Sequence, residues 1–104
     1  MNISNLYILS PNTTYNSITR ELYINGHIVR LKGVEGRFLQ LLCAKNHEVA
    51  SKSYLIHGIW GNANKNKASE LKKYASLVRS YLKSDSSLQI EFRDGGYMLF
   101  QLES

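Results

Sequence analysis

The sequence predicts an α+β domain in which an N-terminal antiparallel sheet is followed by three helices and a C-terminal β-hairpin. Runs of β-prone residues separated by turn residues occupy the first third of the chain and return near its end. Between them, hydrophobic residues recur three and four positions apart, as in amphipathic helices. The chain has 104 residues, of which 43% are apolar and 20% charged, so it suits one hydrophobic core and is too apolar to be disordered. We therefore predict one domain over residues 1–104, with the sheet in 1–32, the helices in 33–83 and the hairpin in 88–102.

The N-terminal sheet is predicted from three β-prone runs, residues 6–9, 20–24 and 27–31. The last two runs flank Asn25-Gly26, a pair that accepts positive φ at both central positions of a type I′ turn. These two runs should therefore form a hairpin. The polar residues 10–14 (Ser-Pro-Asn-Thr-Thr) predict a break after the first run.

The three helices follow from periodicity and from residues that start or stop a helix. The first is predicted from Val34 to Asn46. Ser51 is suited to capping the start of the second, which Gly61 stops. The third should run over about 68–83.

The remaining segments are predicted to be a link, a loop and a hairpin. Residues 48–50 suggest a short extended link, and residues 62–67 a solvated loop. Residues 88–92 and 97–100 are typical of strands, and Asp94-Gly95-Gly96 between them favours a turn. A hairpin should therefore close the domain.

The positive charge of the chain is concentrated in one third of it. Thirteen Lys and Arg against eight Asp and Glu give a net charge of +5. Residues 52–83 hold seven of the bases and one acid, Glu70, so this stretch carries +6 and the rest of the chain −1. Such a local excess points to a polyanionic partner.

The predicted third helix has two faces of different character. A narrow apolar stripe of Leu71, Ala75, Val78 and Leu82 should pack on the core. The opposite face combines lysines, which can reach phosphates or guanine acceptors, with small serines, which allow close approach to DNA. An ordinary solvated helix can also have such a face, but Glu70 is its only acid, so the usual acid–base pairs are almost absent. This face comprises Ser69, Lys72, Lys73, Ser76, Ser80 and Lys83, with Arg79 at its edge.

Beside the core stripe lies a second group of larger side chains, Tyr74, Leu77 and Tyr81. They are expected to pack against the first helix and the hairpin. Exposed together, they would instead form a patch for binding another protein.

The sequence contains no recognisable catalytic, metal or cofactor motif. Cys43 is the only cysteine, which fits a reducing cytoplasm, and Cys43 and His47 alone make a poor zinc site. We find no phosphate-binding glycine loop, nucleophile elbow or paired carboxylates, and neither a secretory signal nor an apolar run of membrane-spanning length. We therefore predict no enzyme activity, no cofactor and a cytoplasmic location.

The order of elements and their residues resemble the OmpR/PhoB-type winged helix-turn-helix domain, especially its one-component ToxR/CadC branch. The resemblance covers nearly the whole chain and rests on an ordered set of short motifs. These are Glu35-x-x-Phe38-Leu39-x-Leu41-Leu42, Glu48-Val49-x-Ser51-x-x-x-Leu55, Ile59-Trp60-Gly61, Leu71-x-x-Tyr74-Ala75-x-x-Val78-Arg79-x-x-Leu82 and Arg93-x-Gly95-Gly96-Tyr97-x-Leu99.

The resemblance implies sequence-specific binding of double-stranded DNA by a bacterial transcription regulator. In that family the third helix lies in the major groove and the hairpin, or wing, reaches the minor groove. Arg93 would then enter a narrow A·T-rich minor groove. The DNA-binding residues implied are Ser69, Lys72, Lys73, Ser76, Leu77, Arg79, Ser80 and Lys83 on the helix, and Arg93 and Tyr97 on the wing. For Tyr97 the resemblance leaves open a core position, a phosphate contact or both.

Other partners and a second function stay open. The loop residues Asn62, Asn64, Lys65, Asn66 and Lys67 correspond to a segment that touches RNA polymerase in some relatives, and an ordinary loop is the alternative. Self-association, another regulator, and membrane anchoring through a segment absent from this chain are further expectations of the resemblance. The alternative function is a winged-helix module that binds protein, with weak or no DNA binding of its own.

Overall fold

The N-terminal sheet has four antiparallel strands in the order β1-β2-β3-β4, one more than predicted. The structure, a computed structural model, describes residues 5–45, 48–61 and 67–102. The predicted break at residues 10–14 is wrong in part, because only Pro11 and Asn12 form the turn and the next strand begins at once. The strands are β1 (Leu6–Ser10), β2 (Thr13–Asn16), β3 (Glu21–Ile24) and β4 (His27–Arg30).

The unpredicted strand β2 brings a core residue into the sheet. Tyr15 is fully buried, and its hydroxyl donates a hydrogen bond to the carbonyl oxygen of Gly36 at 3.0 Å. Burial is the main cause that raises the pKa of Tyr15 to about 12. The turn between β3 and β4 agrees with the prediction, since Asn25 and Gly26 have φ angles of 47° and 82°.

The helices lie close to their predicted positions. The predicted N-cap of the second helix is confirmed, because the Ser51 hydroxyl accepts a hydrogen bond from the backbone N–H of Tyr54 at 3.1 Å. Gly61 ends this helix with a φ of 84°. The helices are α1 (Gly33–Ala44), α2 (Lys52–Trp60) and α3 (Ala68–Leu82).

The C-terminal hairpin supplies two strands of a three-stranded sheet, the central one included. Strands β6 (Leu88–Arg93) and β7 (Gly96–Gln101) form the predicted hairpin, with positive φ at Asp94 and Gly95 in its turn. The segment predicted only as an extended link supplies β5 (Ala50–Ser51), which pairs antiparallel with β7. We call the β6–β7 hairpin the wing; β5 therefore attaches it to the start of α2.

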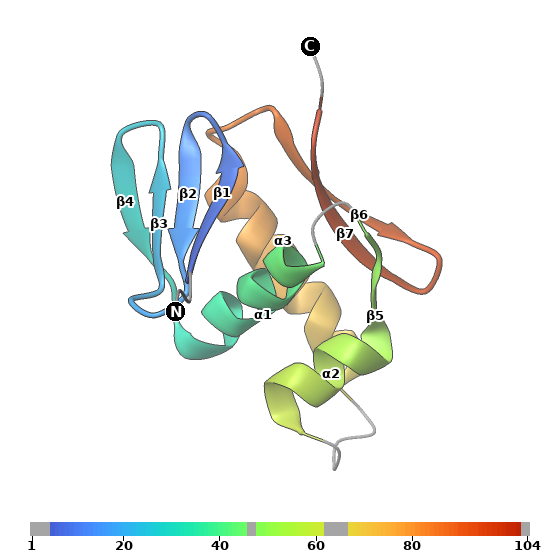
Figure 1. The fold of residues 1–104 in the computed structure, drawn as a ribbon. Helices are drawn as coiled ribbons and strands as arrows, with labels where there is room; N and C mark the ends of the chain where they lie inside the picture. Colours follow the sequence, from blue (N-terminus) through green and yellow to red (C-terminus); the bar gives the residue numbers. More distant parts are fainter. Residues whose placement is uncertain (1–4, 46–47, 62–66, 103–104) are drawn as a thin grey trace.

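Helices α1 and α3 lie between the four-stranded sheet and the wing, and α2 lies below them, next to β5 (Figure 1). One hydrophobic cluster runs through all three parts, with Tyr15 and Leu22 from the sheet, Phe38 from α1 and Leu99 from the wing. The outer face of the sheet carries a row of exposed Ile8, Tyr23 and Ile28 side chains, which oppose one another across neighbouring strands through Thr14.

A buried carboxylate joins the sheet to the end of α3. The Oδ2 atom of Asp85 accepts hydrogen bonds from the hydroxyls of Ser10 and Thr13, each at 2.5 Å. Its Oδ1 atom accepts the backbone N–H and the hydroxyl of Ser87, just before β6. Burial alone would raise the pKa of Asp85, but these hydrogen bonds outweigh it and hold the pKa at about 2.

Candidate nucleic-acid interface

Helix α3 turns an apolar stripe inward and a basic face outward. Leu71, Ala75, Val78 and Leu82 are at most 3% exposed, as the predicted core stripe requires. Lysine and serine side chains occupy the exposed positions between them, and Leu77 is half-buried at the edge of this face. The exposed residues are Ser69, Lys72, Lys73, Ser76, Arg79, Ser80 and Lys83. The helix therefore presents the polar residues that the sequence singled out on one accessible side.

Several of these side chains have partners inside the protein. Arg79 donates its Nε–H to the carbonyl oxygen of Ile90 in β6 at 3.0 Å. The Ser80 hydroxyl donates to the carbonyl oxygen of Leu77 at 2.6 Å, and the ammonium of Lys73 lies 5.1 Å from the centre of the Tyr74 ring. Arg79 thus links α3 to the wing in addition to exposing positive charge.

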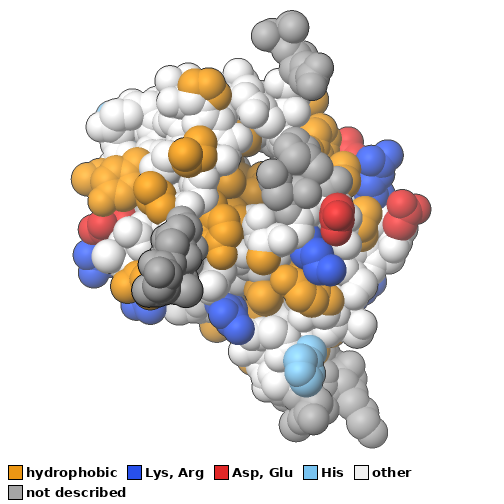
Figure 2. All heavy atoms as spheres, in the orientation of Figure 1, with side chains coloured by type: hydrophobic (Ala, Val, Ile, Leu, Met, Phe, Trp, Pro, Cys, Tyr) orange, Lys and Arg blue, Asp and Glu red, His pale blue; other side chains and the backbone are white. Residues whose placement is uncertain are grey.

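The arginine of the wing lies beside two acidic residues. Arg93 is exposed at the end of β6, and its Nε atom lies 3.8 Å from Oε1 of Glu91. Asp94 follows in the turn, also exposed. Figure 2 shows acidic and basic side chains next to each other at this end of the molecule. The wing tip therefore has a cation that nearby carboxylates partly compensate.

Tyr97 lies in the core rather than on the surface. The residue is 5% exposed, and its ring packs edge-on against Phe38 and Phe92, with centroid distances of 5.9 and 5.2 Å. Burial raises the pKa of Tyr97, and the nearby Arg79 opposes the rise. Its place in the structure is that of a support for the wing, although it also borders a surface hollow beside α3.

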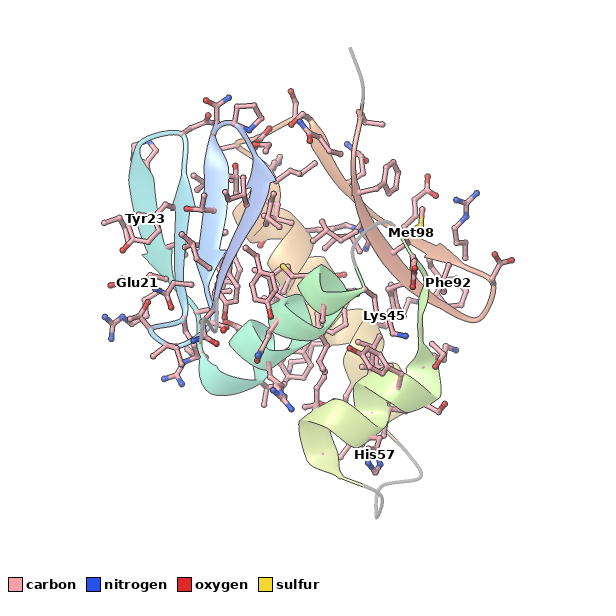
Figure 3. The ribbon with its side chains drawn as sticks, viewed as in Figure 1. Glu21, Tyr23, Lys45, His57, Phe92 and Met98 are labelled. Atoms are coloured by element: carbon pink, nitrogen blue, oxygen red, sulfur yellow. The ribbon has the colours of Figure 1, made fainter. Side chains whose placement is uncertain are left out.

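That hollow contains two residues that the sequence did not suggest as part of the site, Lys52 and Phe92. Phe92 is 54% exposed on β6, where it is labelled in Figure 3. Lys52, the first residue of α2, holds its ammonium 5.1 Å from the centre of the Phe92 ring. The only sequence signal for Lys52 was its place at the start of the basic stretch.

The second apolar group of α3 is half-buried. The Tyr81 hydroxyl donates to the buried carboxylate of Glu35 at 3.0 Å, and the Tyr74 ring lies 6.2 Å from Trp60. Burial first, and then Glu35, raises the pKa of Tyr81. Tyr74, Leu77 and Tyr81 line an open hollow of about 600 Å³ between α3 and the start of α1.

The loop between α2 and α3 can be described only at its end. Asn62, Asn64, Lys65 and Asn66, named above for a polymerase contact, lie outside the described residues. Lys67 is described, and its ammonium lies 5.3 Å from the centre of the Trp60 ring.

The sequence also raised the question of a metal site near the lone cysteine, Cys43. Burial raises the pKa of the Cys43 thiol to about 12, and His47 lies outside the described ranges. Within them, no group of three or more His, Cys, Asp and Glu is placed to hold a metal ion. No helix of the described part is long and apolar enough to cross a membrane.

Comparisons with known proteins relate this geometry to a fold. No family model matches the chain. It is 29% identical over 101 residues to the transcriptional regulatory protein RprY of Bacteroides fragilis; the match covers 96% of this chain and 42% of RprY, so the chain spans less than half of that relative.

Two solved structures have the same architecture. The DNA-binding domain of CpxR from E. coli matches with a TM-score of 0.76 and 19% identity, covering 96% of this chain and all of that one. The Klebsiella pneumoniae RstA DNA-binding domain, in complex with the RstA box, matches with a TM-score of 0.75 and 18% identity, covering 90% and 96% of the two chains. The chain therefore has the winged-helix fold of the CpxR and RstA DNA-binding domains.

Proposed function

We propose that this chain binds specific sequences of double-stranded DNA, as the DNA-binding domain of a bacterial transcription regulator. Helix α3 enters the major groove and the wing reaches the adjacent minor groove. The observation that carries the proposal is the exposed face of α3, where Lys72, Lys73 and Ser76 are accessible together while the opposite stripe is buried. The similarity to RprY and the DNA complex of RstA support it.

The residues divide the work between affinity and sequence recognition. The lysines on the exposed face of α3 and Arg79 neutralise phosphates, which positions the protein on DNA without selecting a sequence. Lys73 and Ser76, nearer the middle of the exposed face, contact base edges. Arg93 reads the negative potential of a narrow minor groove.

Fluorescence anisotropy with a labelled duplex, titrated at several salt concentrations, tests the electrostatic part. With four to seven phosphates neutralised, log K should fall against log[salt] with a slope of about −4 to −6. A flat response would exclude this mode of binding. Selection of bound sequences from a random duplex pool then tests specificity, and a selected pool without a shared motif would contradict it.

Two variants distinguish the effect of the exposed α3 face on DNA affinity from the effect of net charge alone. Lys73→Ala should weaken binding about tenfold or more to the selected sequence. Arg30→Ala, which removes an exposed cation from the outer face of the N-terminal sheet, is the control and should change affinity less than twofold. Equal effects would mean that binding depends only on net charge.

A protein-binding module is the second candidate, and the hollow lined by Tyr74, Leu77 and Tyr81 favours it. In that case Leu77→Ala would abolish binding of a protein partner, while Lys72→Ala, outside this hollow, would not affect it. Salt-dependent binding of duplex DNA by the isolated chain decides for the first candidate.

Finer expectations from the sequence belong to the same proposal. We place the chain in the ToxR/CadC branch and in the cytoplasm, with no catalytic role. RNA polymerase, a second copy or another regulator, and a membrane anchor outside this chain are its further proposed partners or attachments.

A further inference from the structure

A hollow of about 300 Å³ lies where the start of α2, the exposed face of α3 and the wing meet. The described residues around it are three cations and two aromatic rings, together with Ala68 at the start of α3. None of them is acidic. They are Lys52, Lys72, Arg79, Phe92 and Tyr97.

The lysine from α2 is fixed to the wing at two points. Its backbone N–H donates to the carbonyl oxygen of Gly95 in the wing turn at 3.2 Å. Its ammonium lies 5.1 Å from the centre of the Phe92 ring, which itself packs against Tyr97. Phe92 therefore holds a positive charge at the mouth of the hollow, and Lys52 is half-buried there.

Arg79 is held from the other side. Its Nε–H bond to Ile90 uses one of five guanidinium donors and leaves four for other partners. Lys72 lies about two turns of α3 nearer the start of the helix and is exposed. Three like charges around one open hollow repel one another, so an anion with several oxygen atoms would stabilise the arrangement.

The position of the hollow indicates which anion it takes. A helix in the major groove and a wing in the adjacent minor groove have one DNA strand between them, and that strand must pass the gap where the hollow lies. We propose, resting on the DNA-binding function above, that the hollow holds one backbone phosphate of this strand. Lys52, Lys72 and Arg79 contact its oxygens, the Phe92 ring meets the adjoining sugar, and Phe92 also positions Lys52.

The test compares two lysines in matched surroundings. Lys45, labelled with Phe92 in Figure 3, is half-buried like Lys52, and its ammonium lies 4.9 Å from the centre of the Tyr54 ring, but it does not line the hollow. Lys52→Gln should lower affinity about five- to tenfold near 0.1 M salt, for specific and random duplexes alike, and reduce the salt slope by about 0.9. Lys45→Gln should change affinity less than twofold and leave the slope unchanged. Equal effects of the two substitutions would overturn the proposal.

A second pair of variants tests the positioning role of Phe92. Phe92→Leu keeps every charge but loses the ring under Lys52, so affinity should fall about two- to fivefold while the salt slope stays within about 0.3 of the wild type. Phe92→Trp should restore the affinity, since it returns an aromatic face. If Phe92→Leu binds as tightly as the wild type, Phe92 does not position Lys52.

Two controls keep the outcomes separate. Urea unfolding of each variant checks the fold, and Lys52→Arg, which keeps the charge, should retain the wild-type slope. If the wild-type chain shows no salt-dependent DNA binding, both the proposed function and this inference are wrong. If the wild-type chain binds DNA but Lys52→Gln and Lys45→Gln have the same affinity and salt slope, the proposed function stands and only this inference is wrong.

Discussion

Arg79 of α3 and Ile90 of β6 are joined by a hydrogen bond of 3.0 Å from the arginine Nε–H to the backbone carbonyl oxygen. The contact links the last turn of the proposed recognition helix to the middle of β6 in the wing. The distance between the two parts proposed to contact DNA therefore depends on a side chain that is also part of the basic face.

Arg79→Lys should keep the charge but lose this bond, because an ammonium on a flexible stem does not reproduce the planar guanidinium fork. We expect the free energy of unfolding in urea to fall by about 1 kcal/mol. Lys72→Arg, an exposed substitution on the same helix, should change it by less than about 0.5 kcal/mol. If Arg79→Lys is as stable as the wild type, the bond to Ile90 does not support the wing.

Gly96→Ala should separate the wing from the start of α2. A Cβ atom at Gly96 would overlap the carbonyl oxygen of Ala50, and both groups belong to the backbone of the paired strands β5 and β7. The free energy of unfolding should fall by about 1–3 kcal/mol in a denaturant titration. Gly33→Ala provides the control, since nothing lies within 4 Å of a Cβ there, and should not destabilise the fold. A stable Gly96→Ala variant would contradict the tight pairing.

Asp85 should make the fold sensitive to acid. Its folded pKa of about 2 lies below the ordinary value of 3.8, so the carboxylate contributes stability above about pH 4 that is lost as the pH falls towards 2. Urea titrations from pH 6 to pH 2 should show this loss in the wild type. Asp85→Asn should be less stable at pH 6 and show a weaker decline below pH 4. Parallel curves for the two proteins would exclude Asp85 as the acid-sensitive group.

Arg93→Ala should weaken DNA binding most on duplexes with A·T-rich flanks. The narrow minor groove of such sequences has an enhanced negative potential, which favours an inserted guanidinium. Anisotropy titrations with A·T-rich and G·C-rich flanks around one core sequence measure the difference. An equal loss on both duplexes would exclude minor-groove recognition by this residue.

Glu91→Gln should strengthen DNA binding. Glu91 lies 3.8 Å from Arg93 and places a negative charge beside the cation offered to DNA. Because the pair is exposed, the gain should be modest, about two- to threefold in affinity at low salt, and should shrink as salt is added. Glu21→Gln, on the outer face of the N-terminal sheet, should have no such effect. Reduced affinity of Glu91→Gln would show that the carboxylate orients Arg93 instead of competing with DNA.

Local chemistry determined most of what could be predicted of the fold. The cap at Ser51, the stop at Gly61 and the Asn25-Gly26 turn act within a few residues, so their sequence patterns suffice. Strand β2 was missed because Thr13 and Asn16 look like loop residues. Thr13 can be buried because its hydroxyl donates a hydrogen bond to Asp85, which is 72 positions away in the sequence. No local sequence pattern contains that contact.

In the candidate site, too, local patterns could be predicted from the sequence and contacts between distant segments could not. Helical periodicity alone separates the buried stripe of α3 from its exposed lysines. The hollow at Lys52 and Phe92 could not be predicted, because three elements distant in sequence form it. For Tyr97 the family resemblance left a core position and a phosphate contact open, and the structure shows a mainly buried residue whose burial depends on packing against Phe38.

The two-residue strand β5 has a consequence for the cost of recognition. Through its pairing with β7, the wing is already docked beside α2 and α3 before any duplex arrives. Association then requires no ordering of the backbone in these elements, and the entropy lost is chiefly that of long side chains such as Lys72 and Arg93. The proposed DNA interface is therefore preorganised, and complex formation should proceed as a rigid-body encounter whose rate is governed by charge steering.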